Sequence, residues 1–158
     1  MKLFSPYPRL WVSQDTRRFD LLELRDTLRR HGIRKVYNVT TRSPDERLAS
    51  GKLQNVEFIH SPLYDVALDE KGLEAAGRIA EQIIIDLKDD LPVLINCYNA
   101  YNRSFIVAGL VMRNLGLSGE DVVQNILEVR PVALKNQAFK HFLLTGKTHA
   151  PLHPIASS

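Results

Sequence analysis

The chain has 158 residues, of which 44% are hydrophobic and 25% are charged, and its formal net charge is +3. This length suits one domain with a real hydrophobic core, and the composition excludes disordered, collagen-like and disulfide-built proteins. The apolar runs are much shorter than the roughly 20 residues that a membrane span needs. No apolar segment of signal-peptide length lies near the N-terminus. We therefore expect a cytoplasmic protein that does not associate with membranes.

The chain contains one cysteine, Cys97, so no intramolecular disulfide can form. This usage fits a reducing compartment. A lone intracellular cysteine is either an inert core residue or a reactive one, and its neighbours must decide between the two. No Cys/His cluster has the spacing of a zinc site, and we expect neither a metal nor a cofactor. The mild positive charge is compatible with anionic substrates but supports a nucleic-acid partner only weakly.

The first half of the chain predicts strands and helices in alternation. Asp15 or Thr16 can cap the first helix, whose apolar stripe ends before Gly32, a residue typical of a helix C-terminus. In chain order we expect a strand at 10–12, a helix at about 17–31, a strand at 35–39, a helix start at 43–45 and a strand at 56–61.

The second half continues the alternation. Residues 93–95 form a short, continuous apolar run, as expected of a central parallel strand. We expect a loop at 62–69 and helices at about 72–87 and 103–114. Two further helices should run from a cap at Ser118 to 129 and from a cap at Asn136 to 144. The tail at 147–158 is expected to fray. The predicted fold class is α/β, with a mixed, mostly parallel central sheet flanked by helices, in a single domain over residues 1–146.

One segment of the sequence indicates a reactive site. It is predicted to form a strand, a tight loop and a buried helix, in that order. Cys97 follows the strand, and Arg103 lies six residues later at the start of the helix. Backbone N–H groups of such a loop converge on one point, and the helix N-terminus adds partial positive charge. The cradle stabilises a thiolate at Cys97, while the guanidinium of Arg103 matches two phosphoryl oxygens. Ser104 can donate a hydrogen bond to the sulfur.

The spacing from cysteine to arginine alone is a weak signal, and its combination with the strand and the helix is much stronger. The alternative is that Cys97 is a small buried hydrophobe and Arg103 an ordinary cation at a helix start. The predicted phosphate-binding loop consists of Tyr98, Asn99, Ala100, Tyr101, Asn102 and Arg103.

Phosphoryl transfer also needs a proton for the leaving oxygen, and the donor should lie on a nearby loop. Asp65 precedes Cys97 by 32 residues and belongs to the loop after the preceding strand, at the same edge of the sheet. Asp69 is the rival candidate on that loop. Composition alone does not choose between the two carboxyl groups.

Five segments, in order, resemble the protein tyrosine and dual-specificity phosphatases. Residues 96–104 are similar to the family's Cys-x5-Arg-Ser/Thr signature, and 61–65 to the loop that carries its general acid. The others are similar to the opening strand (8–13), the helix–Gly-Ile–strand–Asn segment (31–40) and the closing Arg-Pro, Asn and Phe pattern (129–139). The resemblance implies a dual-specificity phosphatase-like fold.

The resemblance also implies a two-step, metal-free reaction. Cys97 attacks phosphorus while Arg103 and the loop amides hold the oxygens. Asp65 protonates the leaving group and then activates the water that hydrolyses the cysteinyl-phosphate. The implied substrates carry phosphotyrosine, phosphoserine or phosphothreonine in a protein, or are small phosphate esters.

Two positions depart from the family's usual pattern, and they motivate an alternative. Asn96 stands where His is usual, and Ala100 stands where Gly is usual. A catalytically weak pseudophosphatase that binds a phosphorylated partner or nucleotide is therefore one alternative. An RNA or nucleotide 5′-phosphatase is another, motivated by Asn102 and a pI of about 9.1. The sequence leaves the oligomeric state and the physiological substrate open.

Overall fold

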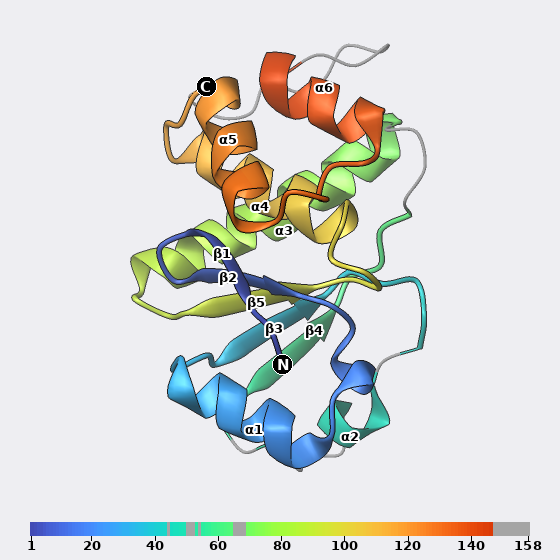
Figure 1. Cartoon of the computed structure of the whole chain (residues 1–158), viewed down its shortest axis with the longest axis vertical. Coiled ribbons are helices and arrows are strands. Elements are labelled where there is room, and N and C mark those ends of the chain that lie inside the picture. The colour runs from blue at the N-terminus through green and yellow to red at the C-terminus, as the bar shows by residue number, and fades with distance from the viewer. Residues whose placement is uncertain (44, 50–52, 54, 65–68, 147–158) are drawn as a thin grey trace.

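In a computed structural model, which describes residues 1–43, 45–49, 53, 55–64 and 69–146, a five-stranded sheet crosses the middle of the molecule (Figure 1). Its order is β1-β2-β5-β3-β4. Strands β2, β5, β3 and β4 are parallel, whereas β1 pairs antiparallel with β2. The strands are β1 (Phe4–Tyr7), β2 (Leu10–Ser13), β3 (Lys35–Asn38), β4 (Glu57–His60) and β5 (Val93–Asn96). This is the mixed, mostly parallel sheet that the sequence predicts.

Helices cover both faces of the sheet unequally. Helices α1 and α2 lie on one face, and α3 to α6 form a thicker layer on the other (Figure 1). The helices are the 3-10 helix η1 (Thr16–Arg18), α1 (Leu21–Arg30), α2 (Glu46–Ala49), α3 (Glu70–Lys88), α4 (Arg103–Asn114), α5 (Gly119–Val129) and α6 (Gln137–Thr145). No helix within the described ranges is long and apolar enough to cross a membrane.

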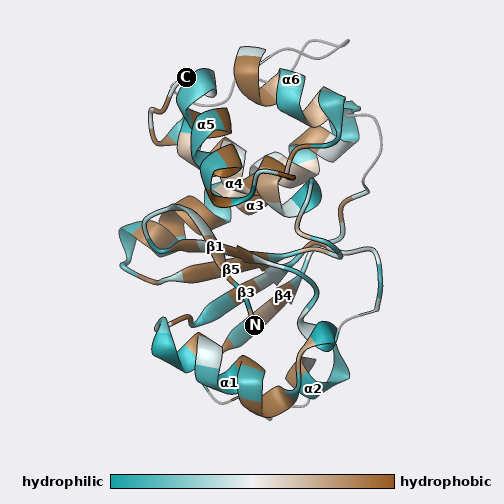
Figure 2. Ribbon diagram, viewed as in Figure 1, coloured by the Kyte–Doolittle hydropathy of each residue, from teal (hydrophilic) through white to brown (hydrophobic). Residues whose placement is uncertain are grey.

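The central strand β5 divides the core between the two faces. Leu94 packs in the smaller cluster with α1, while Val93 and Ile95 pack in the larger cluster with α3 to α6. This split follows from the two-residue period of a strand, which sends successive side chains to opposite faces. In Figure 2 most helices carry both brown and teal segments, as expected of amphipathic helices over a sheet. By contrast, α4 is buried along its first ten residues except Arg103, because other helices surround it.

Side-chain caps explain where the helices begin. Asp69 accepts a hydrogen bond from the backbone N–H of Gly72, Ser118 from Asp121, and Asn136 from Ala138 and Phe139, at 2.7 to 3.2 Å. Each bond satisfies an N–H group that the first turn of a helix leaves without a partner. The caps predicted at Ser118 and Asn136 are therefore confirmed.

One expectation about the N-terminal segment was wrong, and one strand there was not predicted. The helix predicted from residue 17 begins at Leu21 with Asp20 as its cap, because the chain is extended at Phe19 after the short turn η1. Strand β1 was not predicted, and Pro6 lies within it. Proline is tolerated there because β1 is an edge strand, where one side of the backbone needs no ladder partner. The predicted tail at 147–158 lies outside the described residues.

A pair of glycines tests the packing of the helical layer. A Cβ atom on Gly119 would lie 2.4 Å from the carbonyl oxygen of Leu143, whereas one on Gly77 would meet nothing within 4 Å. We expect Gly119→Ala to lower the free energy of unfolding by about 1–3 kcal/mol through overpacking. Gly77→Ala should raise it by about 1 kcal/mol, because alanine is the better helix former. Urea unfolding of both variants measures the two effects, and equal shifts would contradict the packing of α5 against α6.

Candidate active site

The carboxyl ends of the four parallel strands form a row of polar residues. Asn96 of β5 aligns with Ser13 of β2 on one side and with Asn38 of β3 on the other, and Asn38 aligns with His60 of β4. Because parallel strands end at the same edge, the loops that follow them gather there. The segments after residues 13, 38, 60 and 96 therefore share one edge of the sheet.

The loop after the central strand begins with Cys97 and ends at α4. Cys97 is 2% exposed, and its backbone N–H donates to the carbonyl of Ser13 at 3.4 Å. Asn102 occupies the N-cap position of α4, and Arg103 is the first residue of the helix. The predicted order of strand, loop and buried helix is thus present, and it places the N-terminus of α4 over the loop.

The loop amides are the most informative feature of this site. Within the described part of the chain, the backbone N–H groups of residues 98–101 donate to no hydrogen-bond acceptor. Successive backbone N–H groups without a protein acceptor, next to the N-terminus of a helix, are the arrangement that binds anions in proteins, so this run of four donors indicates a place for an anion.

Arg130 holds the loop from outside. Its Nη2 donates to the carbonyl of Asn99 at 3.1 Å and its Nε to the carbonyl of Ala100 at 3.2 Å. The same guanidinium lies over the rings of Phe4 and Tyr101, at 4.6 and 5.0 Å from their centroids. A planar fork suits this double contact better than a lysine ammonium. Arg130 therefore keeps two loop carbonyls turned away from the side where an anion would sit.

The segment before α6 adds two further anchors. The backbone N–H of Leu134 donates to the carbonyl of Tyr101 at 2.8 Å, and that of Asn136 donates to Oδ1 of Asn102 at 2.8 Å. The closing Arg-Pro and Asn pattern of the sequence thus has a physical role, since Arg130 and Asn136 both support the loop.

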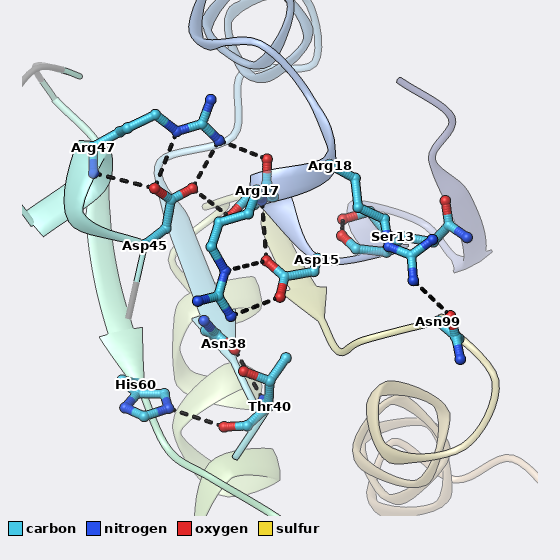
Figure 3. A network of polar contacts seen from close by, with 12 residues as sticks. Ser13, Asp15, Arg17, Arg18, Asn38, Thr40, Asp45, Arg47, His60 and Asn99 are labelled. Atoms are coloured by element: carbon cyan, nitrogen blue, oxygen red, sulfur yellow. Dashed lines mark hydrogen bonds and ion pairs between the residues drawn. The ribbon is translucent and has the colours of Figure 1, made fainter. Parts of the chain in front are cut away.

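The opposite side of the loop rests on the segment after β2. The backbone N–H of Asp15 donates to the carbonyl of Tyr98 at 3.4 Å. Arg18 donates to Oδ1 of Asn99 at 2.8 Å, a bond that Figure 3 shows. The loop is therefore held at both ends by segments that are distant in sequence.

Two ion pairs with buried carboxylates fix that segment in turn (Figure 3). Asp15 pairs with Arg17 at 2.8 Å, and Asp45 pairs with Arg47 at 2.8 Å and accepts from the hydroxyl of Thr16 at 3.1 Å. Burial alone would raise the pKa of the Asp45 carboxyl, but the hydrogen bonds and charge of Arg47, with the Thr16 hydroxyl, outweigh burial and lower that pKa. The carboxylate therefore stays ionised and keeps the turn at η1 in place.

Arg103 and Ser104 occupy the far end of the loop. Arg103 is half-buried, and its Nη1 donates to the carbonyl of Leu63 at 3.4 Å. It therefore reaches toward the segment that follows β4. Ser104 is fully buried, and its hydroxyl has no hydrogen-bond partner among the described residues.

No protein-family model and no curated protein sequence matches this chain. Several solved structures do match this chain. A mouse putative dual specificity phosphatase, solved with zinc tungstate, is 26% identical over 89% of this chain and 83% of its own, with a TM-score of 0.72. Human DUSP28 is 22% identical, covering 89% of each chain, with a TM-score of 0.73. Tk-PTP in its active form is 22% identical over 89% of this chain and 92% of its own, with a TM-score of 0.73.

This chain has the dual-specificity phosphatase fold. The expected fold class is thereby confirmed. Asn96 and Ala100 are the two positions at which the sequence departs from the phosphatase signature that it resembles. Asn96 is fully buried, and neither its amide nitrogen nor its amide oxygen has a partner among the described residues. Ala100 is fully buried with a φ of 56°, in the left-handed region that a glycine adopts without strain.

The structure describes only one of the two candidate general acids. Asp65 lies outside the described residues, so its role stays a prediction. Asp69 is exposed and caps α3, accepting a hydrogen bond from the backbone N–H of Gly72 at 2.7 Å. This side chain is therefore committed to the first turn of α3. This contact favours Asp65 over Asp69.

Three arginines of the site region were not predicted as site residues: Arg18, Arg42 and Arg130. Their contacts with the loop depend on which chain segments meet in space. The only sequence signal for Arg18 and Arg42 is that each follows a parallel strand within a few residues.

Replacing Ala100 with glycine tests the strain in the loop. We expect Ala100→Gly to raise the free energy of unfolding by about 1 kcal/mol, because glycine adopts a positive φ without penalty. Ala75→Gly, within α3, is the matched control and should lower stability by about 1 kcal/mol. Urea unfolding measures both, and a destabilised Ala100→Gly protein would contradict the backbone conformation at residue 100.

Acid titration tests the ion pair between Asp45 and Arg47. We expect Asp45→Asn to lower the free energy of unfolding by about 2 kcal/mol at neutral pH, since charge-assisted hydrogen bonds are lost. The folded-state pKa of Asp45 is lowered, so this contribution is present above the ordinary carboxyl value and is lost as the pH falls through the folded-state value. The gap between the two proteins should therefore shrink in urea titrations below about pH 4. A gap independent of pH would show that the charge of Asp45 does not stabilise the fold.

Proposed function

We propose that this protein is a phosphatase that hydrolyses phosphate monoesters, in a phosphoprotein or a small ester, through a phosphate carried on Cys97. One observation carries the proposal: four successive loop amides that have no acceptor among the described residues lie between Cys97 and Arg103, at the N-terminus of α4. The likeness to dual-specificity phosphatases supports it. We further propose that the reaction uses no metal ion.

In the first step the Cys97 thiolate attacks phosphorus, forming an S–P bond as the P–O bond to the leaving group breaks. Arg103 and the loop amides hold the three remaining phosphoryl oxygens, whose charge they stabilise. Asp65 gives its proton to the leaving oxygen, so an alcohol or phenol departs.

In the second step the Asp65 carboxylate takes a proton from water, and the water oxygen attacks phosphorus. The S–P bond breaks, and inorganic phosphate and the thiolate result. The Ser104 hydroxyl donates a hydrogen bond to the departing sulfur. Its burial and its lack of a partner among the described residues support this role.

A second candidate function is phosphate binding without turnover. The buried side-chain amide of Asn96 and the left-handed backbone at Ala100 favour it, because Asn96 directly precedes Cys97 and Ala100 lies in the loop that must hold the thiolate. Such a protein would bind phosphorylated ligands with negligible hydrolysis. The presence of Cys97, Arg103 and Asp65 together argues for the enzyme.

Kinetics of single variants test the proposal. Wild-type protein should hydrolyse a chromogenic aryl phosphate in the presence of a chelator, and Cys97→Ser should abolish turnover. Arg103→Lys should lower kcat/KM by about a hundredfold, because lysine keeps the charge but loses the two-pronged hydrogen bond.

The two aspartates supply a matched pair of variants. Asp65→Ala should lower kcat by about 10²-fold, the usual effect of losing a general acid. Asp69→Ala should leave kcat near the wild-type value and lower stability by about 1 kcal/mol, as loss of a helix cap does. Activity that survives Cys97→Ser would overturn the mechanism. An inactive, well-folded wild type that binds phosphopeptide would establish the second candidate.

A further inference from the structure

A basic pocket lies at the edge of the sheet opposite the loop that begins with Cys97. Its volume is about 410 Å³, and it is formed by the second half of α1, the turn that leads into β3 and the segment before β4. Figure 1 shows the end of α1 and the start of β3, which bound this pocket. Sites for small organic ligands occupy roughly 300–1,000 Å³, so the hollow is large enough for such a ligand.

The walls of this pocket carry positive charge. Arg25 and Arg29 lie four residues apart on α1 and therefore on the same side of it, and Arg34 comes from the turn before β3. No carboxylate lines the pocket among the described residues. In the same ranges Arg29 and Arg34 form no ion pair, and Arg25 has only a loose contact with Asp26, at 3.8 Å between half-exposed side chains.

The nearest acidic side chains are engaged elsewhere. Glu23 of α1 pairs with the amino group of Met1 at 2.6 Å, and Glu57 of β4 lies 3.7 Å from the ammonium of Lys35. Neither glutamate lines the pocket. The positive charge inside it is therefore left for a ligand to neutralise.

Stabilisation of α1 explains only part of this charge. A cation in the last turn of a helix interacts favourably with the helix dipole, which accounts for Arg29. That effect falls off within one turn, so it does not account for Arg25 or Arg34. Like charges four residues apart on a helix also repel each other, so Arg25 and Arg29 cost the helix stability. A bound anion would remove this repulsion.

The pocket is already formed without a ligand. Leu28 and Ile33 make its floor, at 1% and 3% exposure, and the backbone N–H of Ile33 donates to the carbonyl of Leu28 at 2.9 Å. The backbone N–H of Glu57 donates to the carbonyl of Arg34 at 2.8 Å, which fixes the turn that carries this arginine. A preformed site loses less entropy on binding.

We propose that this pocket binds a small organic polyanion, whose phosphate or carboxylate groups are held by Arg25, Arg29 and Arg34. The planar guanidinium matches the paired oxygens of either group, which is the chemistry that the two ligand types share. Three cations around one hollow favour a ligand with more than one negative charge. The site is remote from the loop after β5, so the inference does not rest on the proposed function.

NMR spectra of ¹⁵N-labelled Cys97→Ser protein report on both sites at once and require no turnover. The probes, titrated separately at low salt, are citrate, adenosine diphosphate and inorganic phosphate. We expect citrate or the diphosphate to shift the amide signals of Ile33 and Val56 with a Kd about tenfold lower than that of inorganic phosphate. A response to citrate alone identifies a polycarboxylate ligand and a response to the diphosphate alone an organic phosphate, and either supports the inference.

Two adjacent arginines supply matched variants. Arg29→Ala should weaken binding of the polyanion at Ile33 and Val56 about tenfold, because charge-assisted hydrogen bonds are lost. Arg30→Ala removes the same charge from the same turn of α1, at a position that does not line the pocket, and should leave the Kd within about twofold. Alanine is a strong helix former, so both variants should keep α1 folded.

Three results would overturn the inference. One is the absence of shifts at Ile33 and Val56 with either polyanion, even where residues 98–101 respond, and that pattern would leave the proposed function standing. Another is an equal loss for Arg29→Ala and Arg30→Ala, which would indicate general attraction to a basic surface. The third is tighter binding of a polyglutamate peptide than of either small polyanion, since the pocket would then hold an acidic protein segment. Shifts at the pocket with none at residues 98–101 would support the inference and count against the proposed function.

Discussion

The conformation of one short loop is the constraint on which the rest of this structure depends. Between Cys97 and Arg103 the backbone turns two carbonyls outward to the guanidinium of Arg130 and leaves four amides without an acceptor among the described residues. A chain does not hold four unpaired donors together unless surrounding contacts fix it. Strand β5, the segment after β2 and the segment before α6 supply those contacts, so most of the fold supports this loop.

Contacts around the loop also explain how the backbone strain at Ala100 is tolerated. A non-glycine residue in the left-handed region costs about 1–2 kcal/mol, and such residues persist where neighbouring contacts determine the backbone. At Ala100 the neighbouring contacts are the hydrogen bond from Arg130 and full burial in the larger core cluster. The methyl group therefore does not prevent the loop conformation, although the signature that the sequence resembles usually has glycine at this position.

Local signals in the sequence were enough to predict most elements. The apolar run at residues 93–95 identified the central strand, and the caps at Ser118 and Asn136 fixed two helix starts, because capping depends only on neighbouring residues. Strand β1 was missed because Pro6 argues against a strand unless it is known to lie at an edge. The support that Arg130 gives the loop was missed because it depends on tertiary packing, which no local pattern encodes. Asp65 remains a prediction, since it lies outside the described residues.

The central claim is that Cys97 carries phosphate during turnover, and trapping that species tests it most directly. Wild-type and Asp65→Ala proteins would be mixed with an aryl phosphate, quenched in acid within milliseconds to seconds, and analysed by intact-mass and peptide mass spectrometry. The account predicts one added phosphoryl group, located on Cys97, and none on Cys97→Ser protein treated identically. Turnover of the ester with no phosphorylated Cys97 at any quench time, or phosphate on a different residue, would contradict it.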